Sequence, residues 1–242
     1  GGYITGDTTW KIQDSPYIVI DNIEIDANST LNVEAGVEIR FGGYFSITVK
    51  GNMTAIGTNS SRIKFTSNKV APSSSDWAGI INYWDAKNLY LEYCIIEYAD
   101  TGVMIRERAK STVIENSIFQ NVGEYAIQSS WANNISINEC TFLGKRVYFS
   151  LSSNLTISNC SFKNSSLSTY FSGEMMISQN FFEGSGQDYG IYAYYNNIEV
   201  CYNRVTGYTS GIVVAGRWIK VHHNKIYGNT YGINVFHSDC DL

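Results

Sequence analysis

A short pattern of alternating apolar residues recurs along the chain at intervals of about 22 residues. Each copy reads apolar-x-apolar-x-x and ends on a small or amide residue, at Cys94, Ser117, Cys140, Cys160, Asn180, Asn203 and Asn224. The steps between these positions are 23, 23, 20, 20, 23 and 21 residues. A fixed period of this length is the signature of a repeat architecture, in which each repeat is one structural unit that stacks on the next.

A second apolar segment follows in most repeats, beginning at Gly102, Ala126, Gly190, Gly211 and Gly232. Alternating apolar and polar residues are typical of short strands, and Gly, Asn and Ser between them are typical of turns. Two or three short strands per repeat predict the coils of a single-stranded parallel β-helix, with strands stacked about 4.8 Å apart. The sequence therefore predicts an all-β fold in which residues 1–242 form one domain of ten to eleven coils.

The recurring small or amide residue is expected at a turn, with its side chain inside the coil. An Asn at such a position bonds backbone groups of its own turn and of the next coil. Cys94, Cys140 and Cys160 fall in the same column and are interpreted as small buried hydrophobic residues.

Both ends of the chain and one internal segment depart from the repeat. Residues 1–20 are expected to form an N-terminal cap over the first sheet edge. Residues 70–76 are expected to form a loop that leaves one coil. After residue 236 the sequence stops where another strand is due, so we expect the C-terminus to be truncated and further domains to belong to a longer protein.

The charge balance excludes several classes of partner. The 17 basic and 22 acidic residues include no run of Lys or Arg, so nucleic-acid binding, which needs clustered positive charge, is not expected. No apolar stretch approaches the roughly 20 residues that span a bilayer, so no membrane insertion is expected. The five cysteines show no C-x-x-C spacing, which argues against a zinc site or a disulfide framework.

The first third of the chain carries a resemblance to a known family. The segments 6–10 (GDTTW), 29–39 (STLNVEAGVEI), 47–51 (ITVKG) and 76–80 (DWAGI) resemble the opening of the right-handed parallel β-helix of secreted prokaryotic proteins. That family is of the carbohydrate-binding and sugar-hydrolysis type, is common on the surface of archaea and bacteria, and includes the archaeal disaggregatase-like proteins. The resemblance implies a right-handed helix, an extracellular or cell-surface location, and a polysaccharide or cell-surface glycan as partner.

Charged residues recur in one turn, just before the second apolar segment. Outward side chains on adjacent coils lie about 5 Å apart, which suits a carboxylate pair acting on one glycosidic bond. In a hydrolase such a pair would be the acid and the base, whereas in a lyase Lys145 or Arg146 would be the base. The alternative is an ordinary surface ion pair, worth about 0–1 kcal/mol. The candidate catalytic residues are Asp100, Glu124, Lys145, Arg146 and Asp188.

The signatures of two well-known β-helix enzyme classes are missing from the sequence. The Asp-Asp pair typical of polygalacturonases is not present, nor is the Arg-x-x-Arg-x-Pro signature typical of pectate lyases. Arg106 and Arg108, just beyond the second strand of the Asp100 coil, are expected to flank the carboxylates and bind substrate.

Aromatic residues recur at two further positions. Flat rings on a rigid surface suit stacking on sugar faces. The alternative is that the rings stack on one another between coils and simply protect the ladder. Trp84, Trp131, Phe171, Tyr195 and Trp218 precede the first strands, and Tyr148, Tyr192, Tyr194 and Phe236 are expected to point outward from the second strands.

No metal or cofactor is expected. His222 and His223 are adjacent on a predicted strand, so their side chains should face opposite sides, and with His237 they are interpreted as surface residues. A Ca²⁺ site at Asp76, Asp85 or Asp188 has no support from an EF-hand-like spacing.

Two functions follow from these features. In the first, the chain is an extracellular carbohydrate-interacting β-helix and part of a cell-surface hydrolase or lyase that degrades a polysaccharide laid along the rod. In the second, it is a noncatalytic structural or adhesion module that binds glycans weakly. Coils of 20–23 residues leave little length for groove-building loops, which favours a flat surface.

Overall fold

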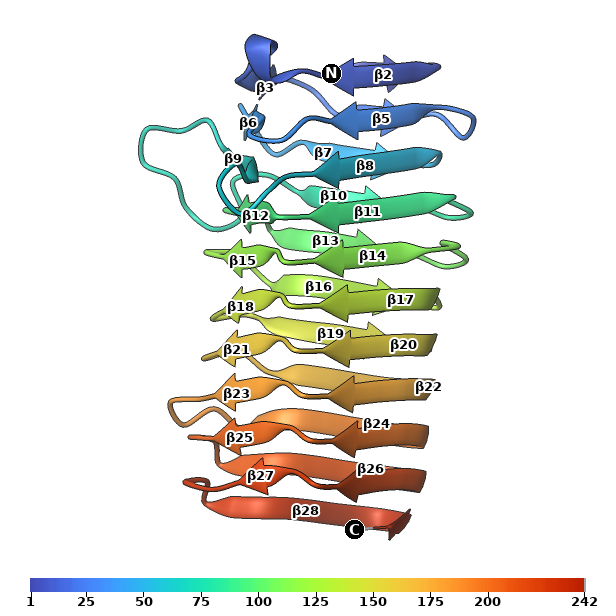
Figure 1. Cartoon of the computed structure of the whole chain (residues 1–242), viewed down its shortest axis with the longest axis vertical. Helices are drawn as coiled ribbons and strands as arrows, with labels where there is room; N and C mark the ends of the chain where they lie inside the picture. Colours follow the sequence, from blue (N-terminus) through green and yellow to red (C-terminus); the bar gives the residue numbers. More distant parts are fainter. Residues whose placement is uncertain (242) are drawn as a thin grey trace.

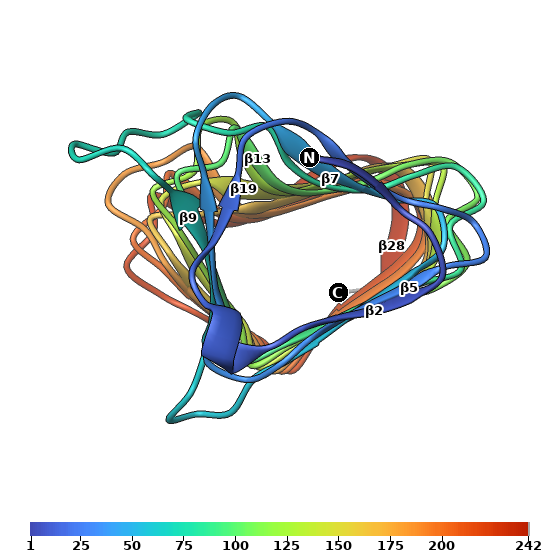
Figure 2. The same cartoon turned by 90° about the horizontal axis from the view of Figure 1, so that it is seen from above.

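The computed structural model describes the backbone of residues 1–241 and their side chains except those of Asn196 and residues 237–241. The described chain winds into a rod of stacked parallel strands, with the two termini at opposite ends (Figure 1). Seen along the rod, the coils have three sides around an interior (Figure 2), which we call faces 1, 2 and 3. Among the described residues, no helix is long and apolar enough to cross a membrane.

The three faces take one strand each from most coils. Face 1 contains β1 (Gly2–Ile4), β4 (Ile23–Ile25), β7 (Ser46–Val49), β10 (Gly79–Asn82), β13 (Thr101–Ile105), β16 (Tyr125–Ser130) and β19 (Arg146–Ser150). Face 2 contains β2 (Asp7–Trp10), β5 (Thr30–Val33), β8 (Asn52–Ile56), β11 (Asn88–Glu92), β14 (Thr112–Glu115), β17 (Asn133–Asn138) and β20 (Ser153–Ser158). Face 3 contains β3 (Tyr17–Val19), β6 (Glu38–Phe41), β9 (Ile63–Ser67), β12 (Cys94–Glu97), β15 (Ile118–Gln120), β18 (Thr141–Leu143), β21 (Ser161–Lys163), β23 (Phe181–Glu183), β25 (Arg204–Thr206) and β27 (Lys225–Ile226).

Later in the chain, single long strands bend through the corner between faces 1 and 2. In the first of these strands, residues 167–170 pair with β19 on face 1, and residues 173–178 pair with β20 on face 2. These strands are β22 (Leu167–Ser178), β24 (Tyr189–Cys201), β26 (Ser210–His222) and β28 (Tyr231–Asp241).

The strand register confirms the predicted parallel β-helix. Paired Cα atoms on face 1 lead from Gly2 to Ile233 in ten steps that cover 231 residues, or about 23 residues per coil. The longest step is the 33 residues from Ile47 to Ile80. This coil carries the loop 68–78 between β9 and β10, where the sequence predicted one (Figure 1).

Residues 1–20, expected to be a cap, form the first coil of the rod. The strands β1, β2 and β3 pair in parallel with β4, β5 and β6 of the second coil. The short 3₁₀ helix η1 (Ile12–Asp14) connects β2 to β3. The repeat therefore begins at the start of the described chain, before the motif becomes regular in the sequence.

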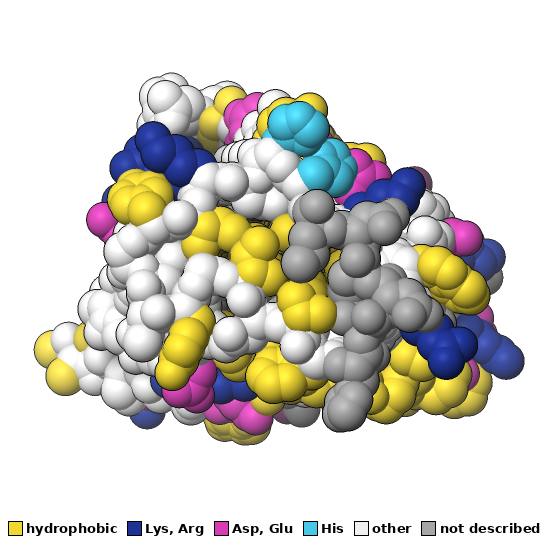
Figure 3. All heavy atoms as spheres, turned by 90° about the horizontal axis from the view of Figure 1, so that it is seen from below, with side chains coloured by type: hydrophobic (Ala, Val, Ile, Leu, Met, Phe, Trp, Pro, Cys, Tyr) yellow, Lys and Arg dark blue, Asp and Glu magenta, His cyan; other side chains and the backbone are white. Residues whose placement is uncertain are grey.

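Inward side chains of equal type stack from coil to coil and form the core. On face 3 the rings of Phe119, Phe142, Phe162 and Phe182 stack with centroid separations of 5.2, 4.8 and 4.2 Å. Full burial of each such side chain stabilises the fold by roughly 1.5–3 kcal/mol. Seen from the end that holds β28, hydrophobic side chains lie in the middle of the rod (Figure 3).

The corner between faces 2 and 3 explains the small and amide residues of the repeat. The residue before each of them has a positive φ between 49° and 58°, which turns the chain sharply and directs the next side chain inward. In this column the backbone N–H of Cys160 donates to Asn180 Oδ1 at 2.9 Å, and that of Asn180 donates to Asn203 Oδ1 at 3.0 Å. Asn180 Nδ2 donates in turn to the Ile157 carbonyl of the preceding coil at 2.9 Å. The Asn side chains therefore bond backbone groups between coils, as predicted, but in the preceding coil and not in the next one.

The hydrogen bonds of the Asn180 side chain predict that Asn180→Ala lowers the stability of the fold substantially. The substitution would leave the Cys160 N–H and the Ile157 carbonyl unpaired in the interior, at roughly 1–3 kcal/mol each. We therefore expect the free energy of unfolding, measured by urea denaturation, to fall by about 2–5 kcal/mol. Asn133→Ala is the control, because Asn133 is exposed on face 2 and should change it by less than about 0.5 kcal/mol. Equal losses for the two variants would contradict the role of the column.

The loop 68–78 is held against the rod by one buried carboxylate. Asp76 accepts hydrogen bonds from Lys69 Nζ at 2.6 Å, from Ser67 Oγ at 2.7 Å and from both the backbone and the hydroxyl of Ser73 at 3.0 Å. Burial by itself raises the pKa of Asp76, but the bonds from Lys69, Ser73 and Ser67 outweigh it and hold the pKa well below the usual range. The ionised carboxylate therefore stabilises the folded state.

This depressed pKa predicts a pH-dependent effect of Asp76→Asn. The unfolded carboxyl titrates near pH ~3.9, so the stabilisation is fully present above that pH and is lost as the pH falls towards the lower pKa of the folded state. We expect urea denaturation to show the largest difference between wild type and variant at pH 6–8 and a shrinking difference below about pH 4. Asp85→Asn, at an exposed turn, should change stability at pH 7 by less than about 0.5 kcal/mol. A difference for Asp76→Asn that does not vary with pH would contradict the ionic role.

Candidate functional site

Four of the five candidate catalytic residues line one cavity at the corner between faces 3 and 1. Each lies in the turn that precedes, or at the first residue of, a strand of face 1, so the repeat itself stacks these side chains. The cavity has a volume of about 400 Å³. It is lined by Glu124, Gly144, Lys145, Arg146, Asn164, Ser165, Ser166, Gln187, Asp188 and Tyr189, and we call it the charged cavity.

Asp100, the fifth candidate, does not line the charged cavity and has partners from an earlier coil. Its carboxylate accepts hydrogen bonds from Ser75 Oγ at 2.7 Å and from the Tyr44 hydroxyl at 3.1 Å. Partial burial raises the pKa of Tyr44, and its bond to Asp100 and the charge of Glu124 raise it further. Asp100 and Glu124 are therefore both close to one phenol.

The coil spacing separates the possible carboxylate pairs. Asp100 and Glu124 precede β13 and β16 on adjacent coils, so their backbones are about 5 Å apart along the rod. Asp188 precedes β24, three coils beyond Glu124, so the backbones of these two residues are about 14 Å apart along the rod. Glycosidase carboxylates lie about 5 Å apart in retaining enzymes and about 6.5–9.5 Å apart in inverting enzymes. The backbone spacing of Asp100 and Glu124 is compatible with a glycosidase pair, while Asp188 shares the cavity with Lys145 and Arg146.

A group of tyrosines crosses face 1 beside the charged cavity. The rings of Tyr125, Tyr148, Tyr170 and Tyr192 follow one another at centroid separations of 5.6, 5.6 and 5.1 Å. Burial, followed by the neighbouring phenols, raises the pKa of Tyr170 to about 12. Together with Tyr189 and Tyr194, which contact Tyr192 and Tyr170, these residues form what we call the tyrosine cluster. The rings stack on one another between coils, as the alternative interpretation from the sequence expected, while their stacking on sugars stays a prediction.

Three members of the tyrosine cluster were absent from the candidates chosen from sequence. Tyr148, Tyr192 and Tyr194 were among them, but Tyr125, Tyr170 and Tyr189 were not. A signal was available, since the positions 125, 148, 170 and 192 are separated by 23, 22 and 22 residues, the length of one coil. Tyr170 was missed because it lies inside the long strand β22, where no turn residues mark the corner.

The corner between faces 1 and 2 carries a second set of rings, which we call the corner aromatics. Positive φ angles of 58°, 52° and 53° place Trp131, Phe171 and Trp218 at sharp bends. Their side chains are about half exposed or more, at 56%, 49% and 67%. The remaining members, Trp84 and Tyr195, are also exposed. These five residues, which the sequence placed ahead of the first strands, therefore present their rings to solvent.

The two candidate arginines lie at this same corner, away from the carboxylates. The Arg108 guanidinium is 5.4 Å from the ring centroid of Trp84, and Arg106 lines a cavity of about 270 Å³ with Gln128 and Tyr148. The expectation that these arginines flank Asp100 is wrong. The strand β13 crosses face 1 between them, so Asp100 and Arg106 are six residues, or about 20 Å, apart.

The histidine pair also differs from the expectation. The Nδ1 atoms of His222 and His223 are 2.7 Å apart, so the two rings do not face opposite sides. His223 has a φ of 55°, which ends the strand alternation on which the expectation rested. The side chain of His237 lies outside the described residues. Among those described, Asp76, Asp85 and Asp188 share no cluster of metal-ligating groups.

The ladders, corners and register define a β-helix protein. The family model of the right-handed β-helix region matches residues 4–149 and again residues 143–242. Because these matches cover nearly the whole chain, the protein belongs to the right-handed β-helix family, as the resemblance implied.

One relative is similar over a short stretch. It is Protein bark beetle of Drosophila melanogaster, which is 36% identical over 63 residues, or 26% of this chain and 2% of the fly protein. The chain therefore matches only a very small part of the length of that relative. No solved structure matches the chain.

Proposed function

We propose that face 1 binds a polysaccharide or cell-surface glycan laid along the rod. The observation that supports this proposal is the tract of outward aromatic rings that recurs from coil to coil beside the charged cavity. Sugar rings present C–H bonds to aromatic faces, and their hydroxyls and carboxylates need polar partners. Trp131 and Trp218 of the corner aromatics offer exposed rings, and the charged cavity offers the polar partners.

The charges of the cavity favour an acidic or polyhydroxylated sugar. Lys145 and Arg146 would bind the carboxylate of a uronate, and Arg does so with two parallel hydrogen bonds. Glu124 and Asp188 would accept hydrogen bonds from sugar hydroxyls. The side chains of the tyrosine cluster connect this cavity to the corner aromatics across face 1, so one long ligand would contact both.

A second candidate function is cleavage of the bound glycan. The observation that favours it is the position of Asp100 and Glu124 on adjacent coils, with Asp100 oriented by Tyr44 and Ser75. In a hydrolase these carboxylates would be the acid and the base or nucleophile. In a lyase Lys145 or Arg146 would remove the proton from the carbon next to the uronate carboxylate. The other cation would stabilise the enolate that forms before the leaving group departs. A noncatalytic adhesion module is the alternative.

The proposal also includes the location of the protein and the group of proteins to which it is related. We infer an extracellular or cell-surface location, and a kinship with archaeal surface proteins of the disaggregatase-like type, from the resemblance of residues 6–80. The low charged fraction of 16% and the many outward Asn, Ser and Thr side chains fit a surface that contacts sugars. In the fly relative the matching stretch is one small part of a long chain, and we propose further domains for this protein as well.

Glycan binding is tested with a panel of acidic and neutral polysaccharides on an array and by calorimetry. We expect Trp131→Ala to weaken binding by about 5- to 150-fold, the equivalent of the roughly 1–3 kcal/mol that stacking of one nucleic-acid base on an aromatic ring contributes. Tyr202→Ala is the matched control, since Tyr202 is exposed to a similar extent but lies at the corner between faces 2 and 3. Equal affinities for the wild type and both variants would overturn the proposed surface.

Cleavage is tested on the polysaccharides that bind, by assaying new reducing ends and unsaturated uronate. If the protein is a hydrolase, Glu124→Gln and Asp100→Asn should each lower turnover by at least about 100-fold, in line with the loss of a general acid or base. Glycan affinity should change little, which separates turnover from binding. Intact polysaccharides in the presence of clear binding would reject the enzyme and leave the adhesion module.

A further inference from the structure

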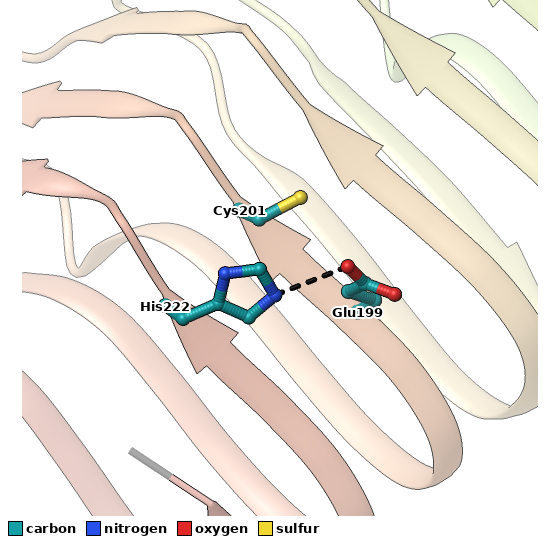
Figure 4. Close-up of side chains that lie close together, drawn as sticks. All are labelled: Glu199, Cys201 and His222. Atoms are coloured by element: carbon teal, nitrogen blue, oxygen red, sulfur yellow. Dashed lines mark hydrogen bonds and ion pairs between the residues drawn. The ribbon is translucent and has the colours of Figure 1, made fainter.

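Three metal-ligating side chains meet on the outer side of face 2 (Figure 4). They are Glu199 and Cys201 of β24 and His222 of β26. One potential ligand atom from each lies within 4.8 Å of those of the other two. His222 Nε2 lies 3.0 Å from Glu199 Oε1.

The repeat places these residues together. Glu199 and Cys201 are two residues apart on one strand, so both lie on its outer side. His222 is the Cα partner of Cys201 on the next coil, which brings its ring beside the thiol and the carboxylate. Cys201 is only 4% exposed, so its sulfur is shielded from solvent more than the other two groups.

We propose that this cluster binds one Zn²⁺ ion through Glu199, Cys201 Sγ and His222 Nε2. Thiolate, imidazole and carboxylate are the three side-chain ligands that Zn²⁺ takes, at about 2.0–2.3 Å, in tetrahedral geometry. Tetrahedral ligand atoms at those distances are roughly 3.3–3.5 Å apart, so small side-chain rotations would close the cluster around an ion. Three protein ligands leave a fourth position for water. The thiol loses its proton to solvent as the Zn–S bond forms, so binding releases one proton.

His223 completes the arrangement as a positioning residue. A metal-bound imidazole is commonly oriented by a hydrogen bond from its other nitrogen. Here His222 Nδ1 lies 2.7 Å from His223 Nδ1, so an Nδ1–H on His222 would donate to His223 and leave Nε2 free to bind the metal. The ring of His223 stacks on Tyr202 at 4.9 Å with an interplanar angle of 22°, which fixes the acceptor.

A simpler interpretation of the cluster is a surface ion pair. A protonated His222 would form a surface ion pair with Glu199, with side chains 35% and 38% exposed, and such pairs contribute only about 0–1 kcal/mol. In that case the thiol of Cys201 would have no part in ion binding. The decisive measurement is therefore whether its sulfur binds the metal.

The test is calorimetric titration of the chelator-treated protein with Zn²⁺, together with Co²⁺ as a spectroscopic probe. We expect one Zn²⁺ per chain, and with Co²⁺ the visible bands of a four-coordinate site and a thiolate-to-metal charge-transfer band. Cys201→Ser should abolish the charge-transfer band and weaken Zn²⁺ binding at least about 100-fold, as loss of a ligand costs no less than loss of its supporting partner. His223→Gln should weaken binding by about 10–100-fold and keep the band.

Glu174→Gln is the matched control, because Glu174 lines the same shallow pocket of face 2 as Glu199 but is not in the cluster. It should bind Zn²⁺ as the wild type does, and circular dichroism should show every variant folded. Absence of Zn²⁺ binding, a Co²⁺ complex without the charge-transfer band, or unchanged affinity in Cys201→Ser would each overturn the proposal. None of these outcomes depends on whether face 1 binds a glycan.

Discussion

Everything in this molecule depends on the requirement that each coil pairs in register with the next through backbone hydrogen bonds. Because the pairing is parallel, a residue on one coil faces the equivalent residue on the following coil about 4.8 Å away. Inward positions must then repeat their shape, as the phenylalanine stack of face 3 does. At the corners, side chains must also form hydrogen bonds with backbone N–H and C=O groups that have no partner in the strand ladders. The asparagines of the column meet that demand, since each accepts from one N–H and donates to one carbonyl of the preceding coil.

The same requirement decides what could be predicted from sequence. The period and the alternation determine the coil length, the inward columns and the residues that share a turn, so Glu124, Lys145, Arg146 and Asp188 were placed together correctly. The distance between two residues of the same coil depends on the strand length and on the corner that each residue occupies. The repeat period predicts neither of these. That is why Arg106, correctly placed just beyond β13, was wrongly expected to flank Asp100 at the start of that strand. The partners of Asp100 come from a turn of the third coil and from the irregular loop 68–78, where no repeat relates the positions.

Outward aromatic rings fall into two classes that differ in what they offer a ligand. The phenols of the tyrosine cluster contact one another along the rod, so part of each ring is already covered. The corner aromatics other than Trp84 stand at bends with positive φ, where the backbone directs bulky side chains away from the sheet. A residue other than glycine is uncommon in that conformation, and Trp131 and Trp218 gain no burial that would offset its cost. Exposed rings that recur at one corner, next to the tyrosine cluster and across face 1 from the charged cavity, support the glycan proposal.

The cysteines show how one step along the chain changes the chemistry of a residue. Cys94 and Cys160 follow the residue with positive φ at the corner of faces 2 and 3, so their thiols point into the coil and donate to backbone carbonyls. Cys201 precedes the equivalent residue, Tyr202, and therefore lies on the outer side of β24. Its neighbours in space are then the carboxylate and the imidazole of two outward residues in place of core side chains. A thiol in the inner column fills space and bonds the backbone, whereas a thiol one residue earlier has two potential metal ligands beside it.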